Sequence, residues 1–198
     1  MLIDPQNLTL HVNHVRSRIR SAAIAAGRDP ESITLVAVTK AKTAESVRLA
    51  ATAGVTDFGE NYLQEAQVKM EQLADLKLKW HFIGGIQSNK TRAIAERFDW
   101  VQSVDRFGVA PDELGTLAAA IAGLPRLRLR GLMCVPPPQA NAAAERAVFA
   151  SLRMALEDLN AGGLKLDTLS MGMSGDFESA IAEGATLVRI GTALFGAR

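Results

Sequence analysis

A lysine at the end of an apolar, β-branched run is the residue of this sequence with the clearest potential for chemistry. Lys40 closes the segment Thr34–Lys40 (TLVAVTK). A run that is apolar on both faces predicts a strand buried in a parallel sheet, and α/β folds keep their chemistry at the carboxyl ends of such strands. A desolvated, neutral amine there can attack an aldehyde and form a Schiff base. The alternative is that Lys40 only marks the point where the strand reaches water.

Two polar segments near the end of the chain follow apolar runs, and both could bind a phosphate group. Ser170–Asp176 (SMGMSGD) joins a predicted strand to a predicted helix, and Arg189–Ala193 (RIGTA) spans the end of the last predicted strand. Ser174 is expected to cap the helix, whose free N–H groups would attract an anion. Because the last two strand ends of a barrel commonly form its phosphate site, these loops predict a phosphate site facing Lys40. The alternative is that Ser174 and Thr192 only cap helices.

A lysine that faces a phosphate site indicates a Schiff base with a phosphorylated aldehyde. Pyridoxal phosphate supplies both groups in one molecule, and a Schiff-base aldolase acting on sugar phosphates would need the same two groups. Lys42 is the competing amine, but we expect it to lie in the loop past the strand and to be solvated. His81, between Trp80 and Phe82, either lines the pocket or is a hydrogen-bonded core histidine. The spacing of the sequence predicts no metal site.

Strands and helices alternate along the chain, as a parallel α/β sheet requires. Seven strands are predicted: Thr34–Lys40, Val55–Gly59, Trp80–Gly84, Trp100–Val104, Leu127–Met133, Thr168–Met173 and Leu187–Gly191. Helical patterns fill the intervals and also precede the first strand. The alternation predicts a (β/α) barrel of the TIM type, with residues 1–198 as a single domain and with one βα unit fewer than the usual eight. A doubly wound open sheet is the alternative, although no GxGxxG motif follows any predicted strand.

The composition is typical of a soluble globular chain. Of the 198 residues, 48% are hydrophobic and 22% are charged, and the formal net charge of +1 gives no electrostatic reason to expect nucleic acid or a membrane as a partner. Cys134 is the only cysteine, which excludes an internal disulfide and a cysteine-based metal cluster. With no signal-peptide pattern and no run of transmembrane length, the expected location is cytoplasmic.

A set of motifs along nearly the whole chain resembles the pyridoxal phosphate homeostasis proteins, the YggS-like or PROSC family. The motifs are AVTK at 37–40, FGENY at 58–62, WHFIG at 80–84, QSNK at 87–90, LRLRGLM at 127–133, SMGMS at 170–174 and VRIGTALFGAR at 188–198. The resemblance implies a barrel of the alanine racemase N-terminal-domain type. It also implies that pyridoxal phosphate is bound through a lysine at the end of the first barrel strand, which corresponds to Lys40.

The resemblance further implies roles for the other site residues. Arg189 would face the pyridine nitrogen, and its permanently charged guanidinium would leave that nitrogen unprotonated and weaken the ring as an electron sink. The phosphate would be held by Ser174, Gly191 and Thr192, and the cofactor would also be lined by Asn61 and His81.

The implied role is that of a non-catalytic carrier, which binds, protects and releases pyridoxal phosphate in intracellular vitamin B6 homeostasis. Enzymes that depend on pyridoxal phosphate are the candidate partners. The family lacks the second domain from which a racemase supplies an opposing tyrosine base, and Tyr62, the single tyrosine of this chain, belongs to a different motif. A pyridoxal phosphate-dependent racemase or lyase of the alanine racemase fold is the alternative.

The main departure from the family is the absence of a helix and a strand after Val104. The family has this unit between the segments 104–106 and 107–109, so the missing βα unit is expected at the junction of Arg106 and Phe107. Smaller departures lie beside the predicted site, at Ala41, Thr43, Ala44, Gly85, Gly175 and Phe177.

Overall fold

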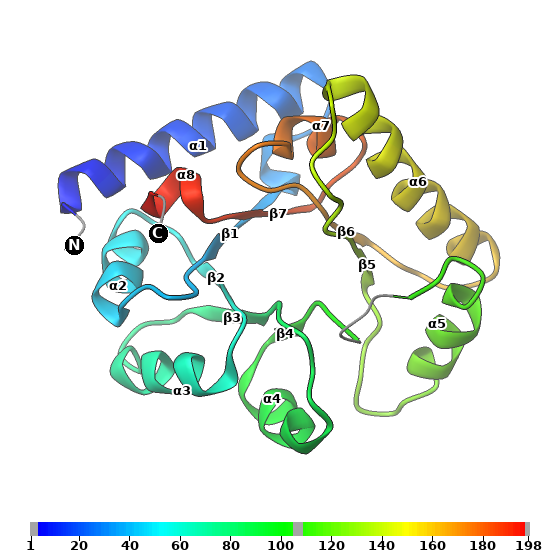
Figure 1. The fold of residues 1–198 in the computed structure, drawn as a ribbon, viewed down its shortest axis with the longest axis horizontal. Helices are drawn as coiled ribbons and strands as arrows, with labels where there is room; N and C mark the ends of the chain where they lie inside the picture. Colours follow the sequence, from blue (N-terminus) through cyan, green and yellow to red (C-terminus); the bar gives the residue numbers. More distant parts are fainter. Residues whose placement is uncertain (1–3, 105–108, 197–198) are drawn as a thin grey trace.

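The computed structural model describes residues 4–104 and 109–196, which form one sheet of seven parallel strands with the helices outside it (Figure 1). The strands are β1 (Thr34–Val38), β2 (Asp57–Glu60), β3 (Lys79–Phe82), β4 (Trp100–Val101), β5 (Gly131–Met133), β6 (Thr168–Ser170) and β7 (Leu187–Ile190). Their order across the sheet is β4-β3-β2-β1-β7-β6-β5, so the first strand lies beside the last.

The helices pack around the outer face of this curled sheet (Figure 1). They are α1 (Pro5–Ala25), α2 (Ala44–Thr52), α3 (Leu63–Gln72), α4 (Thr91–Arg97), α5 (Leu114–Ala122), α6 (Ala142–Ala161), α7 (Phe177–Ala182) and α8 (Thr192–Phe195), with short 3-10 turns η1 (Pro30–Ser32) and η2 (Ser88–Lys90). A doubly wound sheet would carry helices on both faces, so that alternative is wrong. The predicted barrel, one βα unit short, is confirmed.

The longest helix, α1, shows how the sequence builds the outer layer. Asp4 accepts a hydrogen bond from the backbone N–H of Gln6, and Pro5 opens the first turn, where its missing N–H costs nothing. Apolar residues then recur every three or four positions and form one buried face, which packs against α2, α7 and α8. Burial of one such Leu, Val or Ile side chain contributes about 1.5 to 3 kcal/mol. The residues of this face are Leu8, Val12, Val15, Ile19 and Ala23.

The barrel is open between β4 and β5, the two strands at the ends of the sheet order. The expected junction of Arg106 and Phe107 lies outside the described residues, but the structure on either side shows the effect of the missing unit. Strand β4 has two residues instead of the five predicted, and β5 begins at Gly131 instead of Leu127. A parallel strand is stabilised from both sides, so strands that each lack one neighbour are expected to be short.

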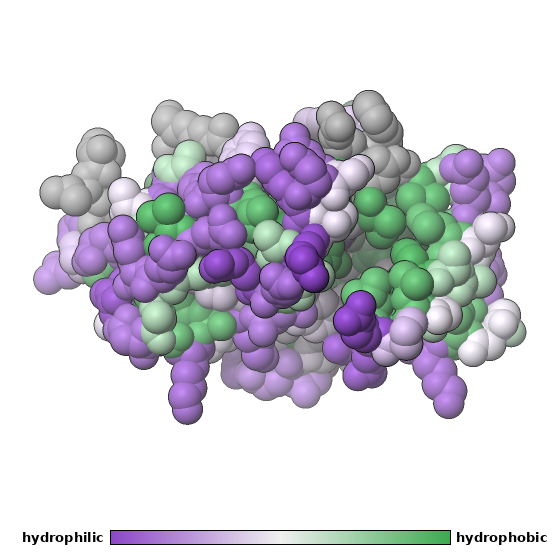
Figure 2. Space-filling model, turned by 90° about the horizontal axis from the view of Figure 1, so that it is seen from below, coloured by the Kyte–Doolittle hydropathy of each residue, from purple (hydrophilic) through white to green (hydrophobic). Residues whose placement is uncertain are grey.

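Helix α5 is apolar along its whole length, yet only Ala118 of its nine residues is buried. Figure 2, seen from below, shows hydrophobic residues gathered on the side of the molecule that carries α5. Leu124, which follows the helix, is 48% exposed, and Met154 on α6 is 57% exposed. Among the described residues, α5 is therefore poorly covered on its apolar surface.

Candidate functional site

Lys40 lies two residues beyond β1, which ends at Val38 and not at Lys40 as the sequence predicted. Its side chain is half-buried and makes no hydrogen bond or ion pair with the described residues. Lys42, which we expected to be solvated, is instead half-buried, and its Nζ donates to the carbonyl of Phe195 at 3.2 Å. Lys40 is thus the amine that this loop leaves available.

The loop that carries Lys40 is fixed by groups that the sequence did not reveal. Ala41 has a φ of +59°, a conformation that costs a residue with a Cβ about 1 to 2 kcal/mol. Its N–H donates to Oε1 of Glu65 on α3 at 2.6 Å, which offsets this cost. Lys69, four residues further along α3, donates from Nζ to the carbonyl of Thr39 at 2.7 Å. Helix α3 therefore holds the loop on both sides of Lys40.

A buried ion cluster supports this contact. The Nζ of Lys69 also lies 2.7 Å from Oε1 of Glu60 and 2.6 Å from Oε1 of Glu65, and Thr39 Oγ1 donates to Glu60 Oε1 at 2.6 Å. Glu60 is fully buried, and burial raises the pKa of its carboxyl group even though Lys69 and Thr39 hydrogen-bond to it. The only sequence signal for the cluster is the spacing of Glu65 and Lys69 at i and i+4 on one helix.

The two predicted phosphate loops are in contact with each other. Ser174, after β6, accepts a hydrogen bond through Oγ from the backbone N–H of Ala193 at 3.2 Å. Strand β7 lies beside β1, with Ile190 opposite Ala37, so Gly191 lies next to the end of the strand that leads to Lys40. The structure thus brings Lys40, Gly191 and Ser174 to one end of the barrel.

The capping roles considered for these loops are wrong. Helix α7 begins at Phe177, with Asp176 and not Ser174 at the N-cap position. Asp176 instead accepts from the N–H of Met173 at 2.6 Å and closes the loop. Thr192 is exposed and is the first residue of α8, a short helix that the sequence did not predict and that has Gly191 at its N-cap. The hydroxyl oxygen of Ser174 therefore satisfies a free N–H in the first turn of α8, while the hydroxyl of Thr192 makes no hydrogen bond to the described residues.

Gly172 is required by packing and not by the approach of a ligand. Its φ is +92°, and a Cβ there would lie 2.7 Å from Cβ of Ala180 and 2.9 Å from Cα of Phe177. Any side chain would therefore push α7 away from the loop. Gly175 is exposed and has nothing within 4 Å of its Cβ position, so it remains the glycine that leaves space for a ligand.

Arg189 points from β7 into the barrel and is only 4% exposed. Its Nη1 donates to Oγ of Ser170, and its Nη2 donates to the carbonyl of Cys134 at 2.7 Å. Burial lowers the pKa of Arg189 to about 10, so the guanidinium is still charged at neutral pH. The same burial raises the pKa of the Cys134 thiol to about 11. The barrel interior therefore contains a fixed cation, and the thiol of Cys134, which packs against the hydrophobic core, is protonated at neutral pH.

Asn61 and His81 differ in whether their side chains have hydrogen-bonding atoms available for a ligand. Asn61 follows β2, and its Oδ1 is buried with no hydrogen-bond partner among the described residues. Such an acceptor costs about 1 to 3 kcal/mol unless something satisfies it. His81 is fully buried, with Nε2 at 2.9 Å from Asp57 Oδ1 and Nδ1 at 2.9 Å from Gln102 Nε2. A direct hydrogen bond from His81 to a cofactor would have to break one of these contacts.

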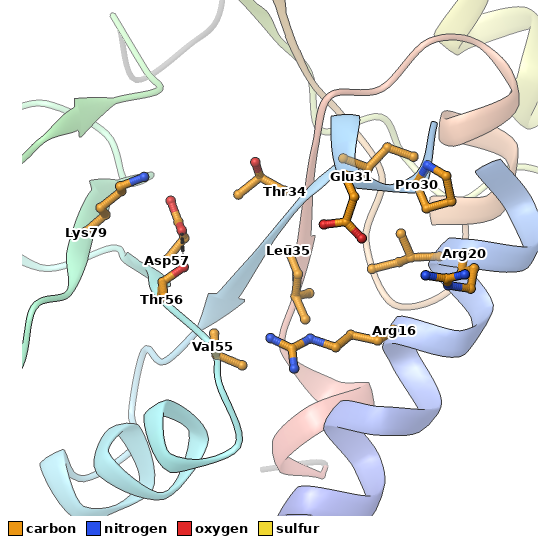
Figure 3. A pocket seen from close by; sticks show the side chains of 12 residues that line it. Arg16, Arg20, Pro30, Glu31, Thr34, Leu35, Val55, Thr56, Asp57 and Lys79 are labelled. Carbon is orange, nitrogen blue, oxygen red and sulfur yellow. Dashed lines mark hydrogen bonds between the residues drawn. The ribbon is translucent and has the colours of Figure 1, made fainter. Parts of the chain in front are cut away.

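Two other cavities lie away from this end of the barrel. One is a cleft of about 480 Å³ at the amino ends of β1 to β3, lined by charged side chains of both signs, among them Arg16, Glu31 and Lys79 (Figure 3). The other lies between α5 and α6 and is lined mainly by apolar residues. Neither contains a residue of the predicted site, and chemistry on a barrel belongs to the carboxyl ends of the strands, so we place the site there.

The described part of the chain was also searched for metal sites and for membrane-spanning helices. In residues 4–104 and 109–196, no three His, Cys, Asp or Glu side chains are grouped as metal ligands would be. No helix within those same ranges is long and apolar enough to cross a membrane.

Comparisons with known proteins identify the family of this chain. A pyridoxal phosphate homeostasis protein of Pseudomonas aeruginosa is 54% identical over 220 aligned positions, which cover 95% of this chain and 94% of the relative. The corresponding protein of Escherichia coli K12 is 43% identical, covering 93% of this chain and 94% of the relative. The chain belongs to the pyridoxal phosphate homeostasis protein family. The alanine racemase N-terminal domain model matches residues 101–198.

Among solved structures, PipY of Synechococcus elongatus, determined with pyridoxal phosphate bound, superposes with a TM-score of 0.85 at 35% identity, covering 96% of this chain and all of PipY. The alignment to the Pseudomonas relative runs over 220 positions, although this chain has only 198 residues, so the relative contains residues that this chain lacks. That surplus agrees with the unpaired edges of β4 and β5.

Proposed function

We propose that this protein binds pyridoxal 5'-phosphate at the carboxyl end of its barrel and acts as a carrier of the cofactor in vitamin B6 homeostasis. The observation that carries the proposal is the position of Lys40. Its half-buried amine has no partner among the described residues and lies between Asn61 on one side and the two contacting loops after β6 and β7 on the other.

The side chains present fit the three parts of the cofactor. The cofactor would supply an aldehyde, and Lys40 would supply the amine for a Schiff base with it, with release of one water. Ser174, Gly191 and Thr192 would hold the phosphate through hydroxyl and backbone N–H groups. Arg189 would donate to the pyridine nitrogen, and the unpartnered Oδ1 of Asn61 would accept a hydrogen bond. His81 would contact the cofactor only through the surface of its ring, since both of its ring nitrogens are hydrogen-bonded to other residues.

We infer that the protein is not an enzyme. Racemisation or elimination needs a base opposite the lysine and a protonated ring nitrogen that accepts electrons. Tyr62 is 64% exposed and makes no side-chain hydrogen bond to the described residues. With a pKa of about 10, Arg189 is a donor at neutral pH and would keep the ring nitrogen unprotonated. A racemase or lyase remains the alternative, and turnover of amino acids by the purified protein would favour it.

The proposal is tested by adding pyridoxal phosphate to the purified protein and to two variants. The wild type and Lys42→Ala should develop the visible absorption band of a Schiff base, and Lys40→Ala should not, while all three keep the same far-ultraviolet circular dichroism. A band of equal strength in Lys40→Ala would refute the assignment of the lysine. We further propose that the carrier acts in the cytoplasm as a single domain and supplies pyridoxal phosphate-dependent enzymes, which restoration of activity to such an apoenzyme would test.

A further inference from the structure

A continuous chain of hydrogen bonds crosses the interior of the barrel beneath the proposed site. Arg189 Nη1 donates to Ser170 Oγ, which lies 2.6 Å from Gln102 Oε1. The other end of the Gln102 amide, Nε2, lies 2.9 Å from His81 Nδ1, and His81 Nε2 lies 2.9 Å from Asp57 Oδ1. The five residues come from β7, β6, the end of β4, β3 and β2. We call them the interior relay.

With the amide of Gln102 oriented as the structure has it, each bond of the interior relay has one direction. The guanidinium of Arg189 can only donate, so Ser170 Oγ accepts from it and must give its own proton to Gln102 Oε1. The amide nitrogen of Gln102 then donates to His81 Nδ1, which must be unprotonated. The proton of a neutral His81 is therefore on Nε2 and is donated to Asp57. The relay runs from a cation to a carboxylate with every donor matched to one acceptor.

The charge at the far end fits this direction. Burial alone would raise the pKa of Asp57, but hydrogen bonds from His81 and Thr56 and the nearby charge of Lys79 outweigh it and lower the pKa. Asp57 is therefore ionised at neutral pH and can accept the proton on His81 Nε2.

Gln102 also crosses the opening of the barrel. Its backbone N–H still bonds to the carbonyl of Phe82 at 2.9 Å and extends β4 by one residue, while its side chain reaches Ser170 on β6. In the described part of the chain, β4 and β5 lie at opposite ends of the sheet order and are not paired. The side chain of Gln102 therefore links two parts of the barrel that backbone pairing leaves apart.

A second contact crosses the same opening. The guanidinium of Arg130, the residue before β5, lies 4.8 Å from the ring centre of Trp100 on β4, and an ion pair of 2.7 Å with Asp167 holds it there. On its other side, Trp100 stacks on His81, with ring centres 5.6 Å apart and planes 7° from parallel. Both crossings therefore meet at His81.

We propose that Gln102 is a positioning residue, which ties β4 to β6 across the opening of the barrel and, through Ser170, fixes the orientation of Arg189. The second part rests on the proposed function, because Arg189 matters to binding only if the cofactor lies against it. Without Gln102, the hydroxyl of Ser170 loses its acceptor and is free to rotate, so its lone pairs no longer face Arg189.

The first test uses the protein without cofactor and reads the protons on the histidine ring by ¹⁵N nuclear magnetic resonance. In the wild type, His81 should carry a proton on Nε2 only. In Gln102→Glu, the new carboxylate can still accept from Ser170 but cannot donate to His81, so Nδ1 of His81 should carry a proton and donate to it. The matched control Gln72→Glu, on the exposed surface of α3, should leave His81 unchanged. An unchanged His81 in Gln102→Glu would overturn the relay.

The second test measures pyridoxal phosphate binding. We expect Gln102→Leu to bind about tenfold more weakly than the wild type and to shift the maximum of the visible band, because one buried hydrogen-bond contact to the relay is lost. Gln72→Leu should match the wild type in both. An equal affinity with an unshifted band in Gln102→Leu would overturn the positioning of Arg189. If the wild type bound no cofactor, the proposed function would fail, while the magnetic resonance test would still decide whether Gln102 forms the tie.

Discussion

Replacement of Lys69 by methionine should destabilise the protein strongly, because the substitution removes the cation from a buried cluster. Lys69 is 4% exposed and Glu60 is fully buried, so solvent cannot take the place of the ammonium group. The Nζ makes three contacts of 2.6 to 2.7 Å, with Thr39, Glu60 and Glu65. Removal of one partner from a buried ion pair typically costs about 3 to 5 kcal/mol, since the other charge is left uncompensated.

A second substitution separates this charge effect from the loss of packing. Glu60→Gln removes the buried charge that Lys69→Met would leave without a partner. We expect the double variant to be about 1 to 3 kcal/mol less stable than the wild type, a smaller loss than that of Lys69→Met alone. The free energies of unfolding would be measured by urea titration at constant m-value. Lys77→Met, at an exposed position, is the control and should change stability by less than about 0.5 kcal/mol. A loss of stability in Lys69→Met no larger than that of the Lys77→Met control would refute the role of the cluster.

Three further predictions follow from the described contacts. Because burial raises the pKa of Glu60 above 4.5, this carboxyl group holds its proton more tightly in the folded protein than in the unfolded chain. Its contribution to the free energy of unfolding should therefore fall as pH rises from about 4.5 through the raised pKa. Urea titrations of Glu60→Gln should lack this component, and parallel pH profiles of the two proteins would contradict it. With a pKa of about 11, Cys134 should be alkylated by iodoacetamide at pH 8 far more slowly in the folded protein than in urea, because only about one thiol in a thousand is ionised; equal rates would argue against its burial. Gly172→Ala should lower the free energy of unfolding by about 1 to 3 kcal/mol, and Gly175→Ala by less than about 0.5 kcal/mol, so equal losses would refute the packing role of Gly172.

The sequence was sufficient to predict the seven strands, their order along the chain and the barrel they form. Short, largely apolar segments that alternate with helical patterns located each of the seven strands, and Thr34–Lys40 is apolar on both faces as a buried parallel strand requires. The strand ends were less predictable, because they depend on neighbours. Residues 102–104 have the pattern of a strand, but β4 ends at Val101 because no strand pairs with its outer edge among the described residues.

The groups that support the site could not be predicted in the same way. Glu65 and Lys69 lie on α3, whose polar residues have the pattern of a solvent-facing surface. In the structure, however, Lys69 points inward and donates to the carbonyl of Thr39. Gln102 and Ser170 are separated by 68 positions in the chain and meet only because the barrel encloses them. Sequence periodicity identifies which face of an element is apolar, but it does not show which polar side chains meet across the interior.

The most direct test of the central claim is to locate the covalent attachment of pyridoxal phosphate. The purified protein would be incubated with the cofactor and reduced with borohydride, which makes a Schiff base permanent, and the modified peptide would then be identified by mass spectrometry. The account predicts one modified residue, Lys40, at close to one adduct per chain. Adducts spread over exposed lysines such as Lys77 and Lys165, with no preference for Lys40, would contradict it.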